Sequence, residues 1–166
     1  IITEEHSTHP TDWPYEKLIH GFNREVIPGY RRITDAVHRH RVPIFAQINH
    51  NGGQASSMYS RLPVWAPSAV ADPLFREVPK AVNAAEIAEI VASYALVAGH
   101  CVEGGFDGVE LQCSHSSIVR GFLSPATNLR TDEYGGSLAN RARILIEIVA
   151  AVRAEIGREL ALGVRL

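Results

Sequence analysis

Polar side chains that could bind an electron-accepting ring follow the short apolar segments of this sequence. They are Glu4 and Glu5, Gln47 with Asn49 and His50, Gln112 with His115, and Arg165. Amides, imidazoles and a guanidinium donate hydrogen bonds and stabilise negative charge. A metal site would need several histidine, cysteine or carboxylate ligands at suitable spacing, and His6 and His9 beside Glu5 lack a further histidine. The residue types therefore favour a planar, hydrogen-bonding ring, and we predict no metal site.

The apolar segments that precede these side chains alternate with helical patterns. Strands are predicted at 1–3, 42–48, 108–112 and 162–166, the first and last of them buried. The clearest helix begins after Asn83, which can form a capping box with Glu86. Further helices are expected around 28–37, with Tyr30, Ile33 and Val37 on one face, and from the cap Ser137 to the stop at Gly157. Polar loops are expected at 4–24, 49–82 and 113–137. This order predicts a parallel sheet with helical crossovers.

Loop lengths decide between the two common parallel architectures. A doubly wound sheet would carry a Gly-x-Gly-x-x-Gly turn, but the glycine pairs at 52–53, 104–105 and 135–136 do not form one. Long loops after strands and short turns after helices are typical of a barrel, whose site lies at the carboxyl ends of the strands. We predict an α/β fold, a partial (β/α)8 TIM barrel with about four of its eight βα units. Residues 1–166 are expected to be a piece of one domain, truncated at both ends.

Composition narrows the class of partner. The chain has 166 residues, 46% of them hydrophobic and 20% charged, with a formal net charge of −2. Since no run of lysine or arginine occurs, we expect no nucleic acid partner. Charged residues and histidines interrupt the apolar stretches, so we expect no membrane span. Cys101 and Cys113 lack the spacing of a disulfide framework, which favours the cytoplasm. We expect a small-molecule substrate, and the sequence is compatible with a homo-oligomer.

A series of specific motifs covers the second half of the chain. They are Gly105–Leu111, His115, Phe122–Pro125, Asn128–Ser137 and Asn140-Arg141, supported by Ile2–Glu5, Gln47–Gly52, Ala66–Ser68 and Val164–Leu166. In this order they closely resemble the old yellow enzyme and 2,4-dienoyl-CoA reductase family of NADH:flavin oxidoreductases. The resemblance extends over the whole chain. The segments 49–59 and 114–117 resemble the branch associated with mycofactocin gene clusters.

The resemblance implies a barrel that binds FMN and accepts electrons from NAD(P)H. It implies that Gln47 hydrogen-bonds the pyrimidine edge of the flavin and that Arg165 lies near N1 and the C2 carbonyl. A permanently protonated guanidinium stabilises the negative charge of the reduced ring. Without the resemblance, Gln47 would be expected to bond loop backbone and Arg165 to pair with Glu110.

The sequence departs from this family where the substrate is bound. Members that reduce activated alkenes hold the substrate carbonyl with a histidine and a following histidine or asparagine, and a tyrosine supplies the proton. Here these positions hold Gln112, His115 and Ser117. Gln112 and His115 can still donate hydrogen bonds to an acceptor oxygen. The Ser117 hydroxyl is too weak an acid to replace a phenol unless another group relays the proton.

The resemblance implies an FMN-dependent oxidoreductase that passes hydride from NAD(P)H through the flavin to an unsaturated carbonyl acceptor. One alternative is a flavin dehydrogenase that acts on a peptide-derived redox cofactor or an alcohol, where His115 polarises the substrate and no tyrosine is needed. Another is that the isolated segment 1–166 is inactive, because the family's remaining barrel units supply part of the cofactor site.

Overall fold

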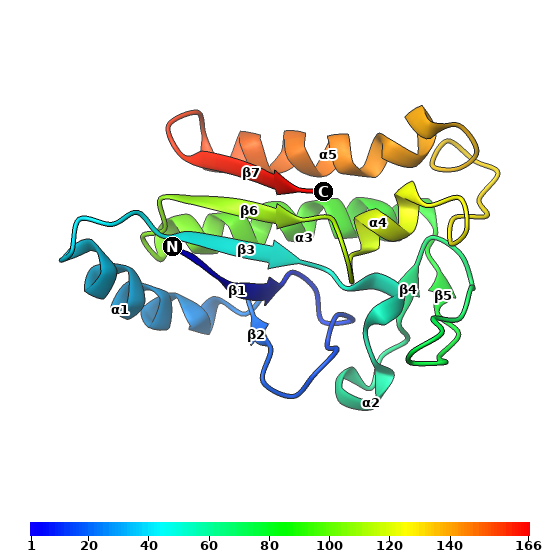
Figure 1. The fold of residues 1–166 in the computed structure, drawn as a ribbon, viewed down its shortest axis with the longest axis horizontal. Coiled ribbons are helices and arrows are strands. Elements are labelled where there is room, and N and C mark those ends of the chain that lie inside the picture. The colour runs from blue at the N-terminus through cyan, green and yellow to red at the C-terminus, as the bar shows by residue number, and fades with distance from the viewer.

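A five-stranded parallel sheet forms the centre of the computed structural model, which describes residues 1–166 (Figure 1). The strands are β1 (Ile2–Ser7), β2 (Ile19–His20), β3 (Phe45–Asn49), β6 (Gly108–Gln112) and β7 (Ala161–Arg165). They lie in the order β2-β1-β3-β6-β7, and every pair is parallel. The predicted parallel α/β architecture is confirmed.

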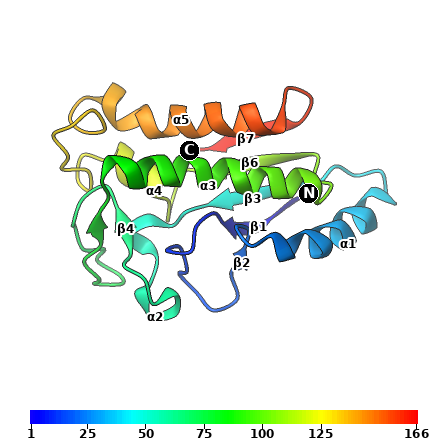
Figure 2. The same ribbon diagram turned by 180° about the vertical axis from the view of Figure 1, so that it is seen from behind.

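The long helices lie on one face of this sheet. They are α1 (Ile27–His38), α3 (Ala84–Glu103) and α5 (Leu138–Ile156). Figure 2 shows α3 and α5 in front of the strands, whereas in Figure 1 the strands are in front and α3 lies behind them. A doubly wound sheet would carry helices on both faces. Helices on a single face are the arrangement of a barrel wall, so the structure supports the predicted partial barrel.

The core fills the space between the sheet and these helices. Strand residues that point toward the helices, such as Ala46, Ile48 and Leu111, are fully buried, and they pack in one cluster with residues of α3 and α5. Residues at alternate strand positions point to the opposite, open face, because successive side chains of a strand alternate between faces. The open face is therefore where polar strand residues can act.

Helix α3 has the capping box expected from its sequence. Asn83 accepts a hydrogen bond from the Glu86 backbone N–H at 3.0 Å, and the Glu86 carboxylate accepts one from the Asn83 N–H at 2.9 Å.

By length and composition alone, α3 is long and apolar enough to cross a membrane, although the sequence analysis predicted no membrane span. In this fold its apolar side packs in the core, with Ile87, Ile90 and Tyr94 completely buried.

Three sequence expectations about strands and helix faces were wrong. The first strand ends at Ser7 rather than near Thr3, because pairing with β3 continues through Ser7↔Asn49. The start of the first strand and most of the last strand are not buried, with Ile2 exposed to 51% and Val164 to 41%, because in this chain these strands lie at or near the edges of the sheet. On α1, Ile33 is exposed and Thr34 is buried instead, because the Thr34 hydroxyl donates to the Gly104 carbonyl at 2.7 Å.

The expected loops contain short ordered elements. The segment 8–26 includes β2 and the 3-10 turn η1 (Arg24–Val26), and the segment 50–82 includes η2 (Gly52–Gln54), α2 (Ser57–Ser60) and the parallel pair β4 (Trp65–Ala66) and β5 (Lys80–Ala81). The segment 113–137 contains helix α4 (Ile118–Leu123). Ile118, Val119 and Phe122 of α4 are buried, so this loop is anchored in the core rather than irregular.

Candidate active site

Two neighbouring rows of side chains cross the open face near the carboxyl ends of the strands. Residues in register on parallel strands share a face, and the first row contains Glu5, Gln47, Glu110 and Gly163. One step further along the strands, Ser7 is in register with Asn49, and Gln112 with Arg165. Gln47, Gln112 and Arg165, which the sequence proposed for the site, therefore lie on the same face of the sheet.

Gln112 is oriented by the residue two positions further on. Its Oε1 accepts hydrogen bonds from the Ser114 backbone N–H at 3.3 Å and from the Ser114 hydroxyl at 2.9 Å. Because a backbone N–H can only donate, this contact identifies the oxygen end of the amide. The Gln112 Nε2 group donates to no other group of the chain, although the residue is only 3% exposed. Gln112 thus presents a fixed, unused N–H donor.

His115 lies beyond the strand end and is exposed. Its Nδ1 is 3.2 Å from the Ser114 hydroxyl, so Ser114 contacts both predicted acceptor ligands. Ser114 was not recognised from the sequence. Its only signal was its place between Gln112 and His115.

Ser117 has a structural role that occupies its hydroxyl. The hydroxyl donates to the Gln112 carbonyl at 2.9 Å and accepts from the Val119 N–H at 3.2 Å, which makes Ser117 the N-cap of α4. The side chain is buried. The position that a tyrosine proton donor would take therefore holds a capping residue whose proton is already used.

Replacing Ser117 with alanine should destabilise the protein by about 1 kcal/mol, since N-cap removal typically costs that much. The change should leave the rate of acceptor reduction by the reduced protein unaltered. Urea denaturation and stopped-flow reoxidation measure the two quantities, with Ser117→Asp as the matched variant that preserves the cap. A clear loss of reoxidation rate in both variants, neither of which has a hydroxyl, would show that the hydroxyl takes part in the chemistry.

Gln47 and Arg165 differ in whether their polar groups have hydrogen-bond or ion-pair partners within the chain. Gln47 Nε2 donates to Glu110 Oε1 at 2.7 Å, so its amide oxygen is the group that remains free. Arg165 is exposed, and its guanidinium makes no ion pair or hydrogen bond within the chain. The alternative pairing of Arg165 with Glu110 is not formed, and Glu110 Oε1 instead accepts from Gln47. The open face therefore carries one unpaired permanent cation beside the free donor of Gln112.

The loops around the site are held together through Glu5 and Asn49. The Glu5 carboxylate accepts hydrogen bonds from Asn49 Nδ2 at 2.7 Å and from the Tyr15 hydroxyl at 3.1 Å. Asn49 Nδ2 also donates to the Ser116 carbonyl at 2.8 Å, which ties the loop after β6 to the end of β3. Glu5 was expected at a strand end, but it lies within β1 and acts as an anchor for these loops.

His50 orders the loop after β3 as a neutral ring. Its Nδ1 accepts from the Gly52 N–H at 3.0 Å, and its Nε2 lies 3.2 Å from the Thr11 hydroxyl. The ring is completely buried. Burial lowers the pKa of His50 to about 3, with a smaller contribution from nearby His9. The neutral form is thus part of the folded structure, and His50 orders the loop instead of binding a ring.

This burial predicts a loss of stability in acid. The unfolded chain binds a proton at His50 below a pKa of about 6.5, whereas the folded chain does so only near 3, so stability falls as the pH drops through this window. From pH 6.5 to about pH 5 the loss attributable to His50 should be about 2 kcal/mol. Urea denaturation of the wild type and of His50→Gln, a neutral acceptor at the same place, isolates this contribution. Parallel pH profiles for the two proteins would contradict it.

The remaining histidines and the cysteine considered for the site have contacts or surroundings within the chain that explain them. His6 lies on the helix face, where its Nδ1 is 2.9 Å from the Tyr30 hydroxyl, and His9 Nε2 is 3.0 Å from Glu89 Oε1. No group of three or more His, Cys, Asp or Glu side chains is arranged to hold a metal ion. Burial raises the pKa of the Cys113 thiol to about 12, so this cysteine is a packed, unreactive residue.

Comparison with known proteins identifies the family of the chain. The model of the NADH:flavin oxidoreductase / NADH oxidase family matches residues 1–166, the whole chain. The chain belongs to this family. The resemblance inferred from the motifs between 105 and 141 is thereby confirmed.

Individual family members are similar in sequence and in structure. A multifunctional alkene reductase/demethylase of Caballeronia cordobensis is 37% identical over 84% of this chain and 21% of its own length. A probable flavin mononucleotide-dependent alkene reductase of Leishmania infantum is 40% identical over 83% of the chain and 42% of its own length. The old yellow enzyme homologue of Zymomonas mobilis superposes with a TM-score of 0.92 at 30% identity, covering 99% of this chain and 49% of that one.

The chain thus spans between about a fifth and a half of these relatives. Coverage of half of a known barrel enzyme supports the prediction of about four βα units.

Proposed function

We propose that this chain forms one side of the active site of an FMN-dependent oxidoreductase, which transfers hydride from NAD(P)H to an unsaturated carbonyl acceptor. The observation that carries the proposal is the pair Gln112 and Arg165. They are in register at the carboxyl end of the sheet, and each has N–H donors that the chain itself leaves unused. Family membership supports the same function.

The residues present fit a flavin. The pyrimidine edge of the ring carries carbonyl oxygens and an N–H group, and it gains negative charge on reduction. Arg165 offers donors and a permanent positive charge to that edge. Gln47 offers its free amide oxygen to an N–H group, while its own N–H group remains bonded to Glu110. Gly163, which is in register with Glu110 between these side chains, adds no bulk to the open face.

Bound FMN would supply the hydride chemistry, accepting a hydride from NAD(P)H and returning it to the acceptor. Gln112 and His115 would bind the carbonyl oxygen of the acceptor and stabilise the charge that develops there. Ser114 is a positioning residue, because its two contacts to Gln112 Oε1 fix the oxygen end of that amide and leave its N–H group free for the acceptor. Since the Ser117 hydroxyl is used in capping α4, the proton for the acceptor must come from water or another residue.

We further propose that the protein acts in the cytoplasm, where its two free cysteines, Cys101 and Cys113, would stay reduced.

A homo-oligomer is compatible with the proposed function, and size-exclusion chromatography with light scattering measures the oligomeric state directly.

The test is anaerobic stopped-flow on the full natural polypeptide that contains this chain. NADPH or NADH should bleach the bound flavin, and enones added in a second mixing step should restore its colour. Failure of every enone, together with bleaching by alcohols or peptide-derived cofactors, would instead indicate a flavin dehydrogenase. Failure of every donor would overturn the proposal.

A further inference from the structure

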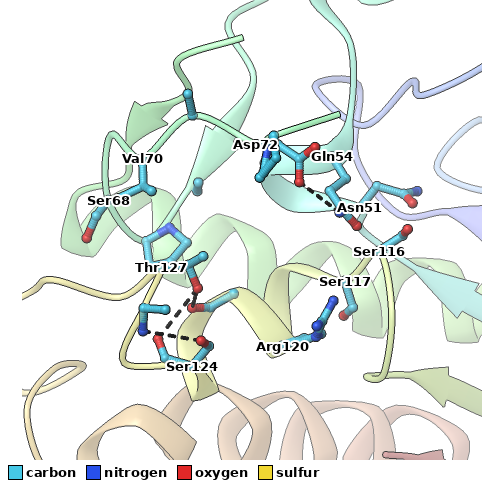
Figure 3. A pocket seen from close by; sticks show the side chains of 17 residues that line it. Asn51, Gln54, Ser68, Val70, Asp72, Ser116, Ser117, Arg120, Ser124 and Thr127 are labelled. Carbon is cyan, nitrogen blue, oxygen red and sulfur yellow. Dashed lines mark hydrogen bonds between the residues drawn. The ribbon is translucent and has the colours of Figure 1, made fainter. Parts of the chain in front are cut away.

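A cavity of about 340 Å³ is lined in part by Ser116 and Ser117, which follow the predicted acceptor ligand His115 in the sequence (Figure 3). One wall is helix α4 with the loops on either side of it, and the other wall is the loop that joins β3 to α3. Ser116 and Ser117 contribute to the first wall, and Asn51, Gln54 and Asp72 to the second. This volume is at the lower end of the range of small-molecule pockets, about 300–1,000 Å³. The cavity can hold part of a small molecule.

The pocket contains two charged residues, of which one, Asp72, is hydrogen-bonded to donors of the chain. Asp72 Oδ2 accepts from Gln54 Nε2 at 2.8 Å. Its Oδ1 accepts from the backbone N–H groups of Leu74 and Phe75 at 2.8 and 3.2 Å. Three uncharged donors therefore hold this carboxylate in place.

Arg120 is the other charged residue, and nothing within the chain pairs with it. It projects from α4 into the space that faces Gln54 and Asp72 (Figure 3). The side chain is exposed, and its guanidinium forms no hydrogen bond or ion pair with the protein. By contrast, Arg130 and Arg141 on the neighbouring segments are each bonded to backbone carbonyls. The Ser116 hydroxyl, on the same wall, also donates to no group of the chain.

The pocket is joined to the predicted acceptor site by direct contacts. The Ser117 hydroxyl donates to the carbonyl of Gln112, and Asn49 donates to the carbonyl of Ser116. His115 immediately precedes Ser116. The segment 112–117 therefore belongs to both, with the predicted acceptor ligands at its start and pocket-lining residues at its end.

We propose that this pocket binds a carboxylate carried by the electron acceptor, with the Arg120 guanidinium as its partner. This inference rests on the proposed function, since it names the acceptor class of the same site. A guanidinium binds a planar carboxylate through two parallel hydrogen bonds. The apolar parts of the lining, Ala66, Pro67 and Val70, suit the short carbon chain between the two ends of such a molecule. The acceptor class is an unsaturated keto acid.

The test compares 4-oxopent-2-enoic acid, an anion at neutral pH, with its methyl ester, which is uncharged and carries one more methyl group. In the full natural polypeptide loaded with FMN, kcat/KM should favour the acid. Arg120→Gln should lower the ratio of acid to ester kcat/KM about tenfold or more. Arg120→Lys should lower this ratio less, because the positive charge remains while the bidentate hydrogen bonding is lost. The control is Arg32→Gln on α1, an exposed arginine without a partner, which should leave the ratio unchanged.

A binding measurement separates the failure of this inference from the failure of the proposed function. Ligand-observed NMR with 4-oxopentanoate, which has no alkene to reduce, requires no turnover. Weaker binding of this acid to Arg120→Gln than to the Arg32→Gln control would support the pocket even in a protein that reduces neither enone. Equal binding and an unchanged acid-to-ester ratio in Arg120→Gln would overturn the pocket, although reduction of the ester would leave the proposed function intact.

Discussion

Replacing Gln112 with leucine is expected to lower kcat/KM for enone reduction by about 10²-fold to 10³-fold, the usual cost of removing a donor to a developing oxyanion. Leucine has a similar volume and the site is buried, so the side chain can be accommodated while the unused N–H group is lost. The reductive half-reaction with NAD(P)H does not use this group and should be far less affected. Separate stopped-flow measurements of the two half-reactions give the required comparison.

Two further variants make the interpretation of Gln112 specific. Gln112→His restores an N–H donor of the type that the resemblance associates with this position, and it should recover most of the lost activity. Ser114→Ala removes the hydroxyl contact to Gln112 Oε1 and leaves the backbone contact, so its effect should be smaller than that of Gln112→Leu. Equal losses in the leucine and histidine variants would mean that Gln112 acts through packing and not through its N–H group.

Replacing Arg165 with methionine is expected to weaken FMN binding about 10-fold to 100-fold, because a hydrogen bond to a charged group contributes about 1.5–3 kcal/mol. If the guanidinium stabilises the reduced ring more than the oxidised ring, the two-electron reduction potential should also fall, by about 30–60 mV. Methionine keeps most of the length of the side chain and removes the charge. FMN titration of the apoprotein and a redox titration against a reference dye measure the two effects.

Arg158 provides the control for Arg165. It is an exposed arginine in the turn between α5 and β7, and it has no partner within the chain. Arg158→Met removes the same charge from the same part of the chain, so it should change neither FMN affinity nor potential. Similar shifts in both variants would attribute the effect to net charge and not to contact with the flavin.

The elements whose local signals agree with their tertiary surroundings could be predicted from the sequence. Asn83 and Glu86 mark the start of α3, and Gly157 has the positive φ of 72° that allows a glycine to end α5. The strand 108–112 was predicted with the residues that β6 has in the structure. Alternation of strands and helices also dictates parallel pairing. Gln47, Gln112 and Arg165, three of the four proposed site residues, could therefore be assigned to one face of the sheet.

Features that depend on long-range contacts could not be predicted. The length of β1 depends on its pairing with β3, more than 35 residues further along the chain. Ile33 is exposed because Thr34 bonds to the Gly104 carbonyl from a distant turn. Helix α4 has only six residues, which is too short for a clear periodic pattern. For this reason the role of Ser117 as an N-cap and the position of Arg120 beside a pocket were visible only in the structure.

The absorption spectrum of the purified full natural polypeptide tests the central proposal most directly. If the open face of this sheet binds a flavin, the protein should be yellow, with flavin absorption bands that remain after gel filtration, and heat should release FMN. A colourless protein that also fails to bind FMN in a titration would contradict the account.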